Sequence, residues 1–185
     1  MANSTVYSDS LSWLHVLGEV RNGTSQAVQN VRVSVRFFDA EGGTVGSAIG
    51  YLTLATLAPG DRSCFQIVRP PIGAAVRYEF LSPEYSTAAG SSVPLQIVHA
   101  EGVFDDGDGW YRVTGALKNT GATRVTAAGV VGTAYDGAHA VVRCDIGHVD
   151  DGSLKPGDSS SFNVAFLPSE AGAVATFRVQ GWAQP

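Results

Sequence analysis

The sequence lacks any cluster of basic residues. Its 12 lysines and arginines are scattered among 17 acidic residues, and the formal net charge is −5. Proteins that bind nucleic acid or anionic membranes use such clusters to release counterions or to attract the surface. The chain also lacks an apolar run close to the ~20 residues that span a bilayer. We therefore expect no nucleic-acid partner and no direct insertion into a membrane.

The residues of catalytic sites are few and scattered. The 4 histidines form no Cys–His pairing, and no Gly-x-Ser-x-Gly turn presents a serine nucleophile. No glycine-rich phosphate loop precedes a helix, because an apolar period of 3.6 residues never persists over roughly ten residues. The sequence therefore predicts that the protein is not an enzyme and holds no cofactor.

The two cysteines, Cys64 and Cys144, are too few for a disulfide framework. Cys144 alternates with Val142 and Ile146, which predicts a small buried side chain on the core face of a strand. A zinc site at Cys144 and His148 would need two further ligands with suitable spacing, and we expect no metal there. Because separate β-domains would hold the two Cα atoms apart, both thiols are predicted to be free.

The sequence repeats itself once. Trp13 and Trp110 lie 97 residues apart, and the same offset aligns the two copies as far as Phe65 and Phe162. A period this long corresponds to a whole small domain, so we predict a tandem duplication. Further matched pairs include Gly18/Gly115, Asn22/Asn119, Val33/Val130, Asp39/Asp136, Gly60/Gly157 and Asp61/Asp158.

Each copy alternates apolar and polar residues with period two, as half-buried strands do. The second copy has smaller residues at the positions predicted to face its core, so we expect that core to be filled differently. A Pro-Gly pair in each copy, at Gly60 and Gly157, predicts a turn before a strand that points Phe65 or Phe162 inward. The predicted inward residues are Leu14, Val16, Gly18, Val20, Val31, Val33, Val35 and Phe37, and then Tyr111, Val113, Gly115, Leu117, Ala128, Val130, Gly132 and Ala134.

These patterns predict an all-β fold: two tandem antiparallel Ig-like or fibronectin-like β-sandwich domains related by duplication. We place the first domain at residues 1–85 and the second at 94–185. Residues 86–93, in a segment rich in small side chains, are predicted to be the linker.

A set of turn and core segments recurs in both copies. The first copy has residues 18–22 (GEVRN), 30–42 (NVRVSVRFFDAEG) and 57–61 (LAPGD), and the second has 115–119 (GALKN), 134–136 (AYD) and 154–158 (LKPGD). On these segments, both copies resemble the FxLYD domain, a bacterial and archaeal Ig-like module of secreted, lipid-anchored or envelope proteins. Val35 stands where that motif has its first Phe, Phe38 stands where it has Tyr, and the second copy has Gly132 and Ala134 where the motif has bulky residues. The resemblance implies a secreted or cell-envelope location and supplies no catalytic residues.

An acidic loop is the sharpest local motif. Asp105, Asp106 and Asp108 lie with two glycines in the segment DDGDG, directly before Trp110. Closely spaced carboxylates around a tight turn are candidate calcium ligands, since Ca²⁺ takes six to eight oxygens. The loop lacks the spacing and closing Glu of an EF-hand, and a solvated hairpin turn explains it equally well.

Aromatic residues are the other binding candidates. Trp13 and Trp110 are predicted to point away from the core, as are Phe38 and Tyr135 at strand ends. Exposed rings of this kind stack on sugars or anchor a protein partner. They also commonly cover the end of a sandwich.

Two functions follow from these observations. The first is a non-catalytic tandem Ig-like module that serves as a spacer or protein-interaction surface in a secreted or cell-envelope protein, with a protein or a cell-surface component as its partner. The alternative is a carbohydrate- or calcium-binding module that uses the acidic loop and the tryptophans. The oligomeric state is left open, because the edge strands are not identifiable from the sequence.

Overall fold

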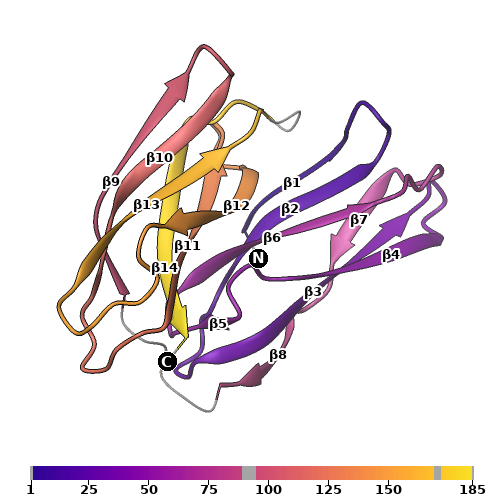
Figure 1. Ribbon diagram of the computed structural model, residues 1–185. Helices are drawn as coiled ribbons and strands as arrows, with labels where there is room; N and C mark the ends of the chain where they lie inside the picture. The colour runs from indigo at the N-terminus through magenta and orange to yellow at the C-terminus, as the bar shows by residue number, and fades with distance from the viewer. Residues whose placement is uncertain (1, 89–94, 169–171, 185) are drawn as a thin grey trace. The chain divides into compact units, whose positions relative to one another are not determined.

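The computed structural model of the protein describes residues 2–88, 95–168 and 172–184. Every regular element in these ranges is a β-strand, so the predicted all-β class is confirmed (Figure 1). The chain divides into two compact units, Met1–Ala89 and Gly90–Pro185, called unit 1 and unit 2 below. Within the described residues, no helix has the length and apolarity needed to cross a membrane.

Unit 1 contains two antiparallel sheets. Its three-stranded sheet has the order β1-β2-β6, formed by β1 (Ala2–Ser8), β2 (Leu14–Arg21) and β6 (Arg62–Arg69). Its second sheet is built on the long strand β3 (Val28–Phe38), to which every other strand of that sheet pairs. Those strands are β4 (Thr44–Tyr51), β5 (Thr56–Leu57), β7 (Arg77–Phe80) and β8 (Glu84–Thr87).

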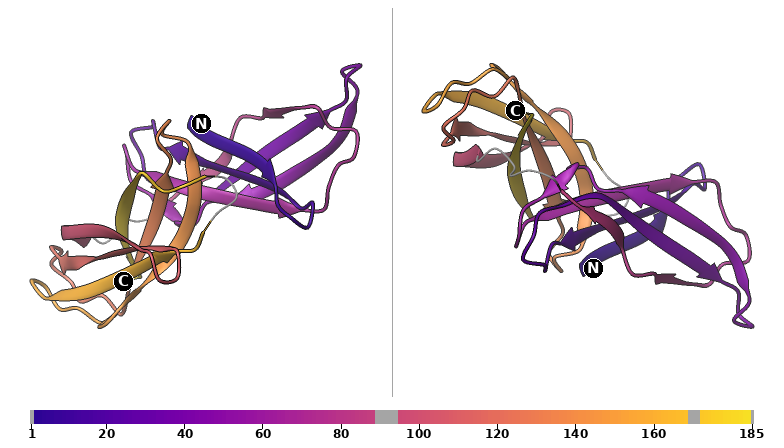
Figure 2. Two further views of the ribbon diagram at one scale, coloured as in Figure 1. Left: turned by 90° about the horizontal axis from the view of Figure 1, so that it is seen from above. Right: turned by 90° about the horizontal axis from the view of Figure 1, so that it is seen from below.

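Unit 2 is one antiparallel six-stranded sheet of order β14-β11-β12-β13-β10-β9. Its outer strands meet: a Cβ placed on Gly181 of β14 would lie 2.9 Å from the Cβ of Leu95 in β9. The sheet thus curls into a nearly closed barrel, which Figure 2 shows in two further views. The strands are β9 (Leu95–Asp105), β10 (Trp110–Asn119), β11 (Ala127–Tyr135), β12 (Val141–Val149), β13 (Ser159–Phe166) and β14 (Thr176–Gln184).

The link between sheets distinguishes the two units. In unit 2, β12 pairs with β13 through His148↔Asn163 and Val149↔Phe162. In unit 1 the corresponding link is the isolated bridge Leu52↔Phe65, at positions 97 residues earlier than Val149 and Phe162. One additional pair in the ladder therefore joins the strands of unit 2 into a single sheet.

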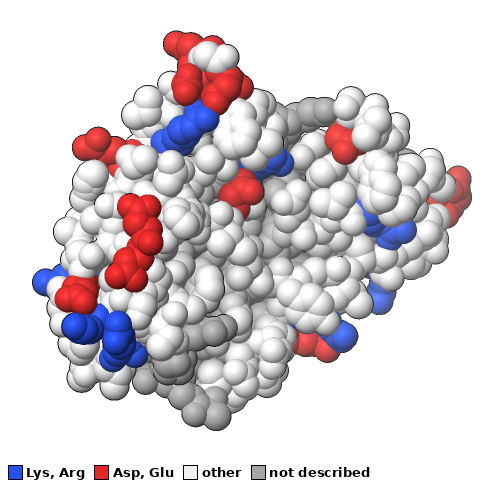
Figure 3. All heavy atoms as spheres, viewed as in Figure 1, with Lys and Arg blue, Asp and Glu red and all other residues white. Residues whose placement is uncertain are grey.

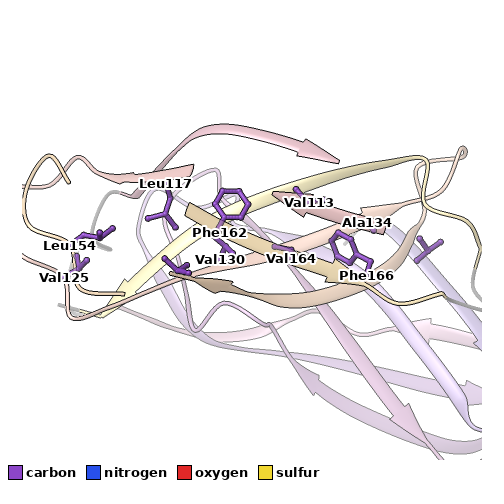
Figure 4. Packing of buried hydrophobic residues seen from close by; sticks show 11 residues of the cluster. Val113, Leu117, Val125, Val130, Ala134, Leu154, Phe162, Val164 and Phe166 are labelled. Carbon is purple, nitrogen blue, oxygen red and sulfur yellow. The ribbon is translucent and has the colours of Figure 1, made fainter. Parts of the chain in front are cut away.

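The predicted core faces are confirmed for the central strands. Val33, Val35 and Phe37 of β3 are buried, and so is Phe65 of β6. In unit 2 the core is formed by residues of β10, β11, β12 and β13 together with two residues of neighbouring loops (Figure 4). Its labelled members are Val113, Leu117, Val125, Val130, Ala134, Leu154, Phe162, Val164 and Phe166.

The second core is indeed filled differently. Gly132 stands 97 residues after Val35, and a Cβ at Gly132 would lie 2.6 Å from Phe166 Cζ and 2.7 Å from Val164 Cγ1. The Phe166 ring, which is 1% exposed, therefore occupies the space that a larger residue would need. The corresponding residue of unit 1 is Arg69, a half-exposed strand end. The side-chain volume that Gly132 lacks on β11 is supplied by Phe166 on β13, which keeps the core closely packed.

The prediction that Phe38 and Tyr135 are exposed aromatic residues is wrong, because both are only 8% exposed. The register shifts beside them place the extra residue on the partner strands, Val45 on β4 and Val142 on β12, so the alternation of β3 and β11 is unbroken. Arg77 lies over the Phe38 ring, 4.0 Å from its centroid. Alternation along one strand cannot show that a residue from a distant segment covers such a ring.

The predicted core position of Cys144 is also wrong. Cys144 is half-buried and Ile146, on the same face, is 65% exposed. The bulge that skips Val142 in the β11–β12 ladder reverses the alternation of the rest of β12.

The start of the predicted linker lies in a strand. β8 pairs with β3 through Val28↔Thr87 and Gln29↔Ser86, so residues 86–87 belong to the sheet of unit 1. The main-chain pairing overrides the loop-like composition of this segment. Residues 89–93 of the predicted linker lie outside the described residues.

Candidate functional site

The acidic loop is the tip of the β9–β10 hairpin. The carboxylate of Asp105 accepts a hydrogen bond from the backbone N–H of Gly107 (2.9 Å), and that of Asp108 accepts one from Trp110 (2.9 Å). Arg112, two residues into β10, donates to Asp105 Oδ2 at 3.1 Å, to Asp108 Oδ1 at 3.1 Å and to Asp108 Oδ2. Figure 3 shows that acidic side chains gather at this hairpin tip, with a basic group beside them.

The internal cation changes what this loop offers to a ligand. The hydrogen bond from Arg112 lowers the pKa of Asp108, and the same contact raises the pKa of Arg112. Arg112 also lies over the Trp110 ring, 5.3 Å from its centroid. Among the described residues, no three or more His, Cys, Asp or Glu side chains are grouped to hold a metal ion. Calcium binding by Asp105, Asp106 and Asp108 therefore stays a prediction.

The β1–β2 hairpin of unit 1 repeats this arrangement with a different cation. Asp9 accepts hydrogen bonds from the backbone N–H groups of Leu11 (3.0 Å) and Trp13 (2.8 Å). His15, 97 residues before Arg112, places its Nε2 2.9 Å from Asp9 Oδ2. The Tyr7 ring stacks on His15 at 4.7 Å between centroids. The hydrogen bond with His15 lowers the pKa of Asp9.

The two candidate tryptophans differ in exposure. Trp13 is 42% exposed and follows Leu11, which is 78% exposed, so the unit 1 hairpin presents an apolar tip. Trp110 is half-buried against Arg112. The pair predicted from the sequence therefore comprises one open ring and one covered ring.

Two buried asparagines hold equivalent loops, a role that the sequence analysis did not assign. The Asn22 side-chain NH₂ donates to the carbonyls of Gln26 (2.8 Å) and Leu57 (3.0 Å). The Asn119 NH₂ donates to the carbonyls of Thr123 (2.9 Å) and Leu154 (3.0 Å), each 97 residues later. Their alignment in the repeat was the only signal that could have found them.

The backbone around each asparagine repeats as well. Asn22 N–H donates to the Asp61 carbonyl at 2.8 Å, and Asn119 N–H donates to the Asp158 carbonyl at 2.9 Å. The following turns place Gly60 at φ +85° and Gly157 at φ +86°, the left-handed conformation predicted after each proline. We call each buried asparagine with these contacts an asparagine brace.

The prediction of two free thiols is wrong. The structure contains no free cysteine, and both Cys64 and Cys144 are in disulfide form. Alternation along a strand cannot reveal such a bond, because it depends on which residues meet in space.

One open hollow lies on the outer surface of unit 2. It measures about 520 Å³ and is lined by side chains of β9, β10 and β13 and by Asp150, which follows β12. His99, Thr114, Ser161 and Asn163 give it a polar lining. Sequence analysis missed this site, because its residues come from distant segments and form no motif.

Comparisons with known proteins assign no family. No model of a protein family matches the chain, and no curated protein sequence matches it. Solved structures that are similar to it include an exo-chitosanase of Amycolatopsis orientalis, with 16% identity, a TM-score of 0.33, and coverage of 98% of this chain and 26% of that one. Another is red sea bream transglutaminase, with 11% identity, a TM-score of 0.29, and coverage of 99% and 29%. The chain thus spans only about a quarter of these proteins.

Proposed function

We propose that the protein is a non-catalytic tandem Ig-like module, produced by duplication of one β-sandwich domain, that acts as a spacer or protein-interaction surface in a secreted or cell-envelope protein. The observation that carries this proposal is the pair of asparagine braces. Buried side-chain hydrogen bonds, backbone hydrogen bonds and a left-handed glycine recur at the same offset of 97 residues.

The strand registers support the duplication. β2 pairs with β6 through Gly18↔Phe65, and β10 pairs with β13 through Gly115↔Phe162. A Cβ on Gly18 would lie 2.7 Å from Phe65 Cζ, and one on Gly115 would lie 2.6 Å from Phe162 Cζ. The residues shared by both copies thus shape the backbone and core. The FxLYD resemblance rests on many of the same residues, which favours an Ig-like fold of that kind.

Differences between the copies lie at the hairpin tips and on sheet faces. An apolar tip with Trp13 in unit 1 corresponds to an acidic tip with Asp108 in unit 2. Binding functions are commonly placed on variable loops over a constant scaffold. This division supports an interaction role, with a protein or a cell-surface component as partner.

The state of the cysteines supports the proposed compartment. Disulfides persist in oxidising environments such as the cell exterior and the periplasm, and they are rare in the cytosol. A chain whose two cysteines are both in disulfide form fits a secreted or envelope location.

Fractionation of the source cells, combined with thiol alkylation and mass measurement, tests this location. We expect the chain in the envelope or secreted fraction, with no alkylation before reduction and two alkylated thiols after it. A cytosolic chain that is alkylated without reduction would contradict the proposal. Reproducible turnover of any substrate that one polar substitution abolishes would contradict the non-catalytic role.

Carbohydrate or calcium binding is the second candidate. It is favoured by the exposed Trp13 and by the acidic tip carrying Asp105, Asp106 and Asp108. Thermal unfolding with millimolar Ca²⁺ or with EDTA, together with a glycan-array screen, separates this candidate from the first. A Ca²⁺-dependent rise in melting temperature that Asp108→Asn removes, or a glycan hit that Trp13→Ala removes, would establish the second candidate.

A further inference from the structure

Four neighbouring strands of unit 2 present two rows of polar or small side chains on their outer surface. Strand register places the residues of one row side by side across β9, β10, β13 and β12, and those of the other row lie two residues along each strand. We call these eight residues the polar face. Its first row is Glu101, Thr114, Asn163 and His148, and its second is His99, Ala116, Ser161 and Asp150.

The four corners of the polar face carry its ionisable groups. On β9, His99 Nε2 lies 4.0 Å from Glu101 Oε1, and the two side chains are 51% and 77% exposed. At the end of β12, His148 Nε2 lies 3.9 Å from Asp150 Oδ1, and these are 80% and 69% exposed. Smaller uncharged side chains occupy β10 and β13 between the corners, which produces the open hollow described above.

The order of the charges is the decisive feature. In the first row an acid on β9 stands opposite a histidine on β12, and in the second row a histidine stands opposite an acid. A half-turn about an axis parallel to the strands, between β10 and β13, brings β9 of one copy over β12 of another. Glu101 then meets His148 of the other copy, and His99 meets its Asp150. Thr114 meets Asn163, a pair able to hydrogen-bond.

Three central positions of this face are buried in unit 1. Leu17, Glu19 and Cys64 stand 97 residues before Thr114, Ala116 and Ser161, and they are 0%, 2% and 0% exposed. The centre of the face is therefore buried in one copy of the repeat and open in the other, where its polar surface suits a reversible contact.

We propose that the polar face binds a second copy of the chain face to face, about a two-fold axis parallel to the strands. The pattern is self-complementary, as an isologous dimer requires. No like charges come face to face: Lys118, the next outward residue of β10, meets Ser159, and Arg112 meets Ala165. Arg112 is also neutralised within its own copy by Asp105 and Asp108.

The size of the contact sets the strength of the dimer. β9, β10 and β13 run side by side for about eight residues, and β12 joins them for two, which covers roughly 400 Å² per copy. Two such surfaces bury about 800 Å², below the range of stable specific contacts, so the dimer is weak and reversible. The hollow between the corners holds water, as polar interfaces of this size commonly do.

Sedimentation equilibrium of the full chain across a concentration series tests the proposal. We expect the chain to self-associate reversibly at pH 6. Glu101→Lys brings like charges together and lowers the association constant at pH 6 at least tenfold. Glu41→Lys changes the net charge equally at an exposed loop residue away from this face, and it leaves the association constant unchanged.

A charge exchange provides the strictest test. The double variant Glu101→His and His148→Glu keeps every opposite-charge pair about the proposed axis, so its association returns to within threefold of the original at pH 6. A chain that is monomeric throughout the concentration series, or a double variant no better than Glu101→Lys, overturns the proposal. NMR shifts of polar-face residues caused by an added oligosaccharide, without dimerisation, would overturn it in favour of a ligand. Because a spacer needs no self-association, failure here leaves the proposed function intact.

Discussion

Each unit has a hairpin tip in which an aspartate pairs with a basic side chain, and that side chain differs between the units. Asp9 in unit 1 and Asp108 in unit 2 each accept the backbone N–H of the tryptophan that follows the tip. His15 supplies the positive partner in one unit and Arg112 supplies it in the other. Arginine offers several N–H donors in a planar fork, and here Arg112 binds two carboxylates, whereas His15 binds one. The two hairpins therefore share a geometry and differ in the cation that completes it.

The asparagine braces show the opposite behaviour. Asn22 is 4% exposed, Asn119 is 0% exposed, and their side-chain NH₂ groups donate to the same pair of carbonyls in each copy. A buried polar group must find partners within the fold, so its neighbours cannot change freely. The comparison teaches that the buried polar framework was kept in both copies, while groups in contact with water were free to diverge.

Removing a brace has the largest expected effect. We predict that Asn22→Ala and Asn119→Ala each lower the free energy of unfolding by about 2–4 kcal/mol, because several hydrogen bonds are lost and buried carbonyls are left unpaired. The two losses agree within about 1 kcal/mol if the braces are equivalent. Urea denaturation of the full chain measures them. Gln26→Ala is the control, because Gln26 takes part only through its backbone carbonyl.

Substituting alanine for Gly18 or Gly115 compares how tightly the equivalent strands of the two units are packed. A Cβ at Gly18 meets the movable Phe65 ring, whereas a Cβ at Gly115 also lies 2.2 Å from the backbone oxygen of His99. We expect Gly18→Ala to cost about 1–3 kcal/mol, as overpacking does, and Gly115→Ala to cost more. Adding Phe65→Leu recovers part of the loss in unit 1, and adding Phe162→Leu gives little recovery in unit 2. Equal costs and equal recovery would show that the two strands are packed alike.

A charged pair specific to unit 2 has a smaller effect. Burial raises the pKa of Asp145, whose Oδ2 lies 3.9 Å from Arg143 Nε; unit 1 has Ala48 and Gly46 at these positions. Its folded pKa lies above its unfolded value, so its contribution to stability is present below about pH 4 and is lost as pH rises through the folded pKa. Asp145→Asn should therefore flatten the pH dependence of the melting temperature between pH 4 and pH 7. As a control, Ala48→Asn places an asparagine at the equivalent position of unit 1, and it should leave the pH dependence of the melting temperature unchanged.

The smallest effect is a local change at the hairpin tips. In both hairpins the aspartate pKa is lowered, so the stabilisation by Asp9 and Asp108 is lost only as pH falls below about 4. We expect the backbone N–H resonances of Trp13 and Trp110, which donate to these carboxylates, to shift in that acidic range. Asp9→Asn removes the shift of Trp13 alone, and Asp108→Asn removes that of Trp110 alone. A pH titration followed by NMR in which neither resonance shifts would contradict the assignment of these hydrogen bonds.

Much of the scaffold was predictable because it depends on local patterns. Alternation located Val33 and Phe37 on the core face, and the Pro-Gly turns predicted left-handed Gly60 and Gly157. Each of these signals lies within a few residues of the chain, where turn and strand preferences act.

The misses arose where distant residues meet or where the period breaks. A bulge on β12 reversed the alternation that had placed Cys144 in the core, and Arg77 from a distant strand covers Phe38. The disulfide state of the cysteines has no local signature. For the candidate sites, the sequence identified the acidic loop and Trp13 but could not show that Arg112 neutralises Asp108. The polar face was invisible for the same reason, because its eight residues lie on four strands.

Cross-strand nuclear Overhauser effects test most directly whether the two units share one register. Each contact between paired residues of β2 and β6, such as Gly18 with Phe65, should recur between β10 and β13 at positions 97 residues later, such as Gly115 with Phe162. A ladder displaced by even one residue in either unit, or helical contacts within these strands, would contradict the duplication.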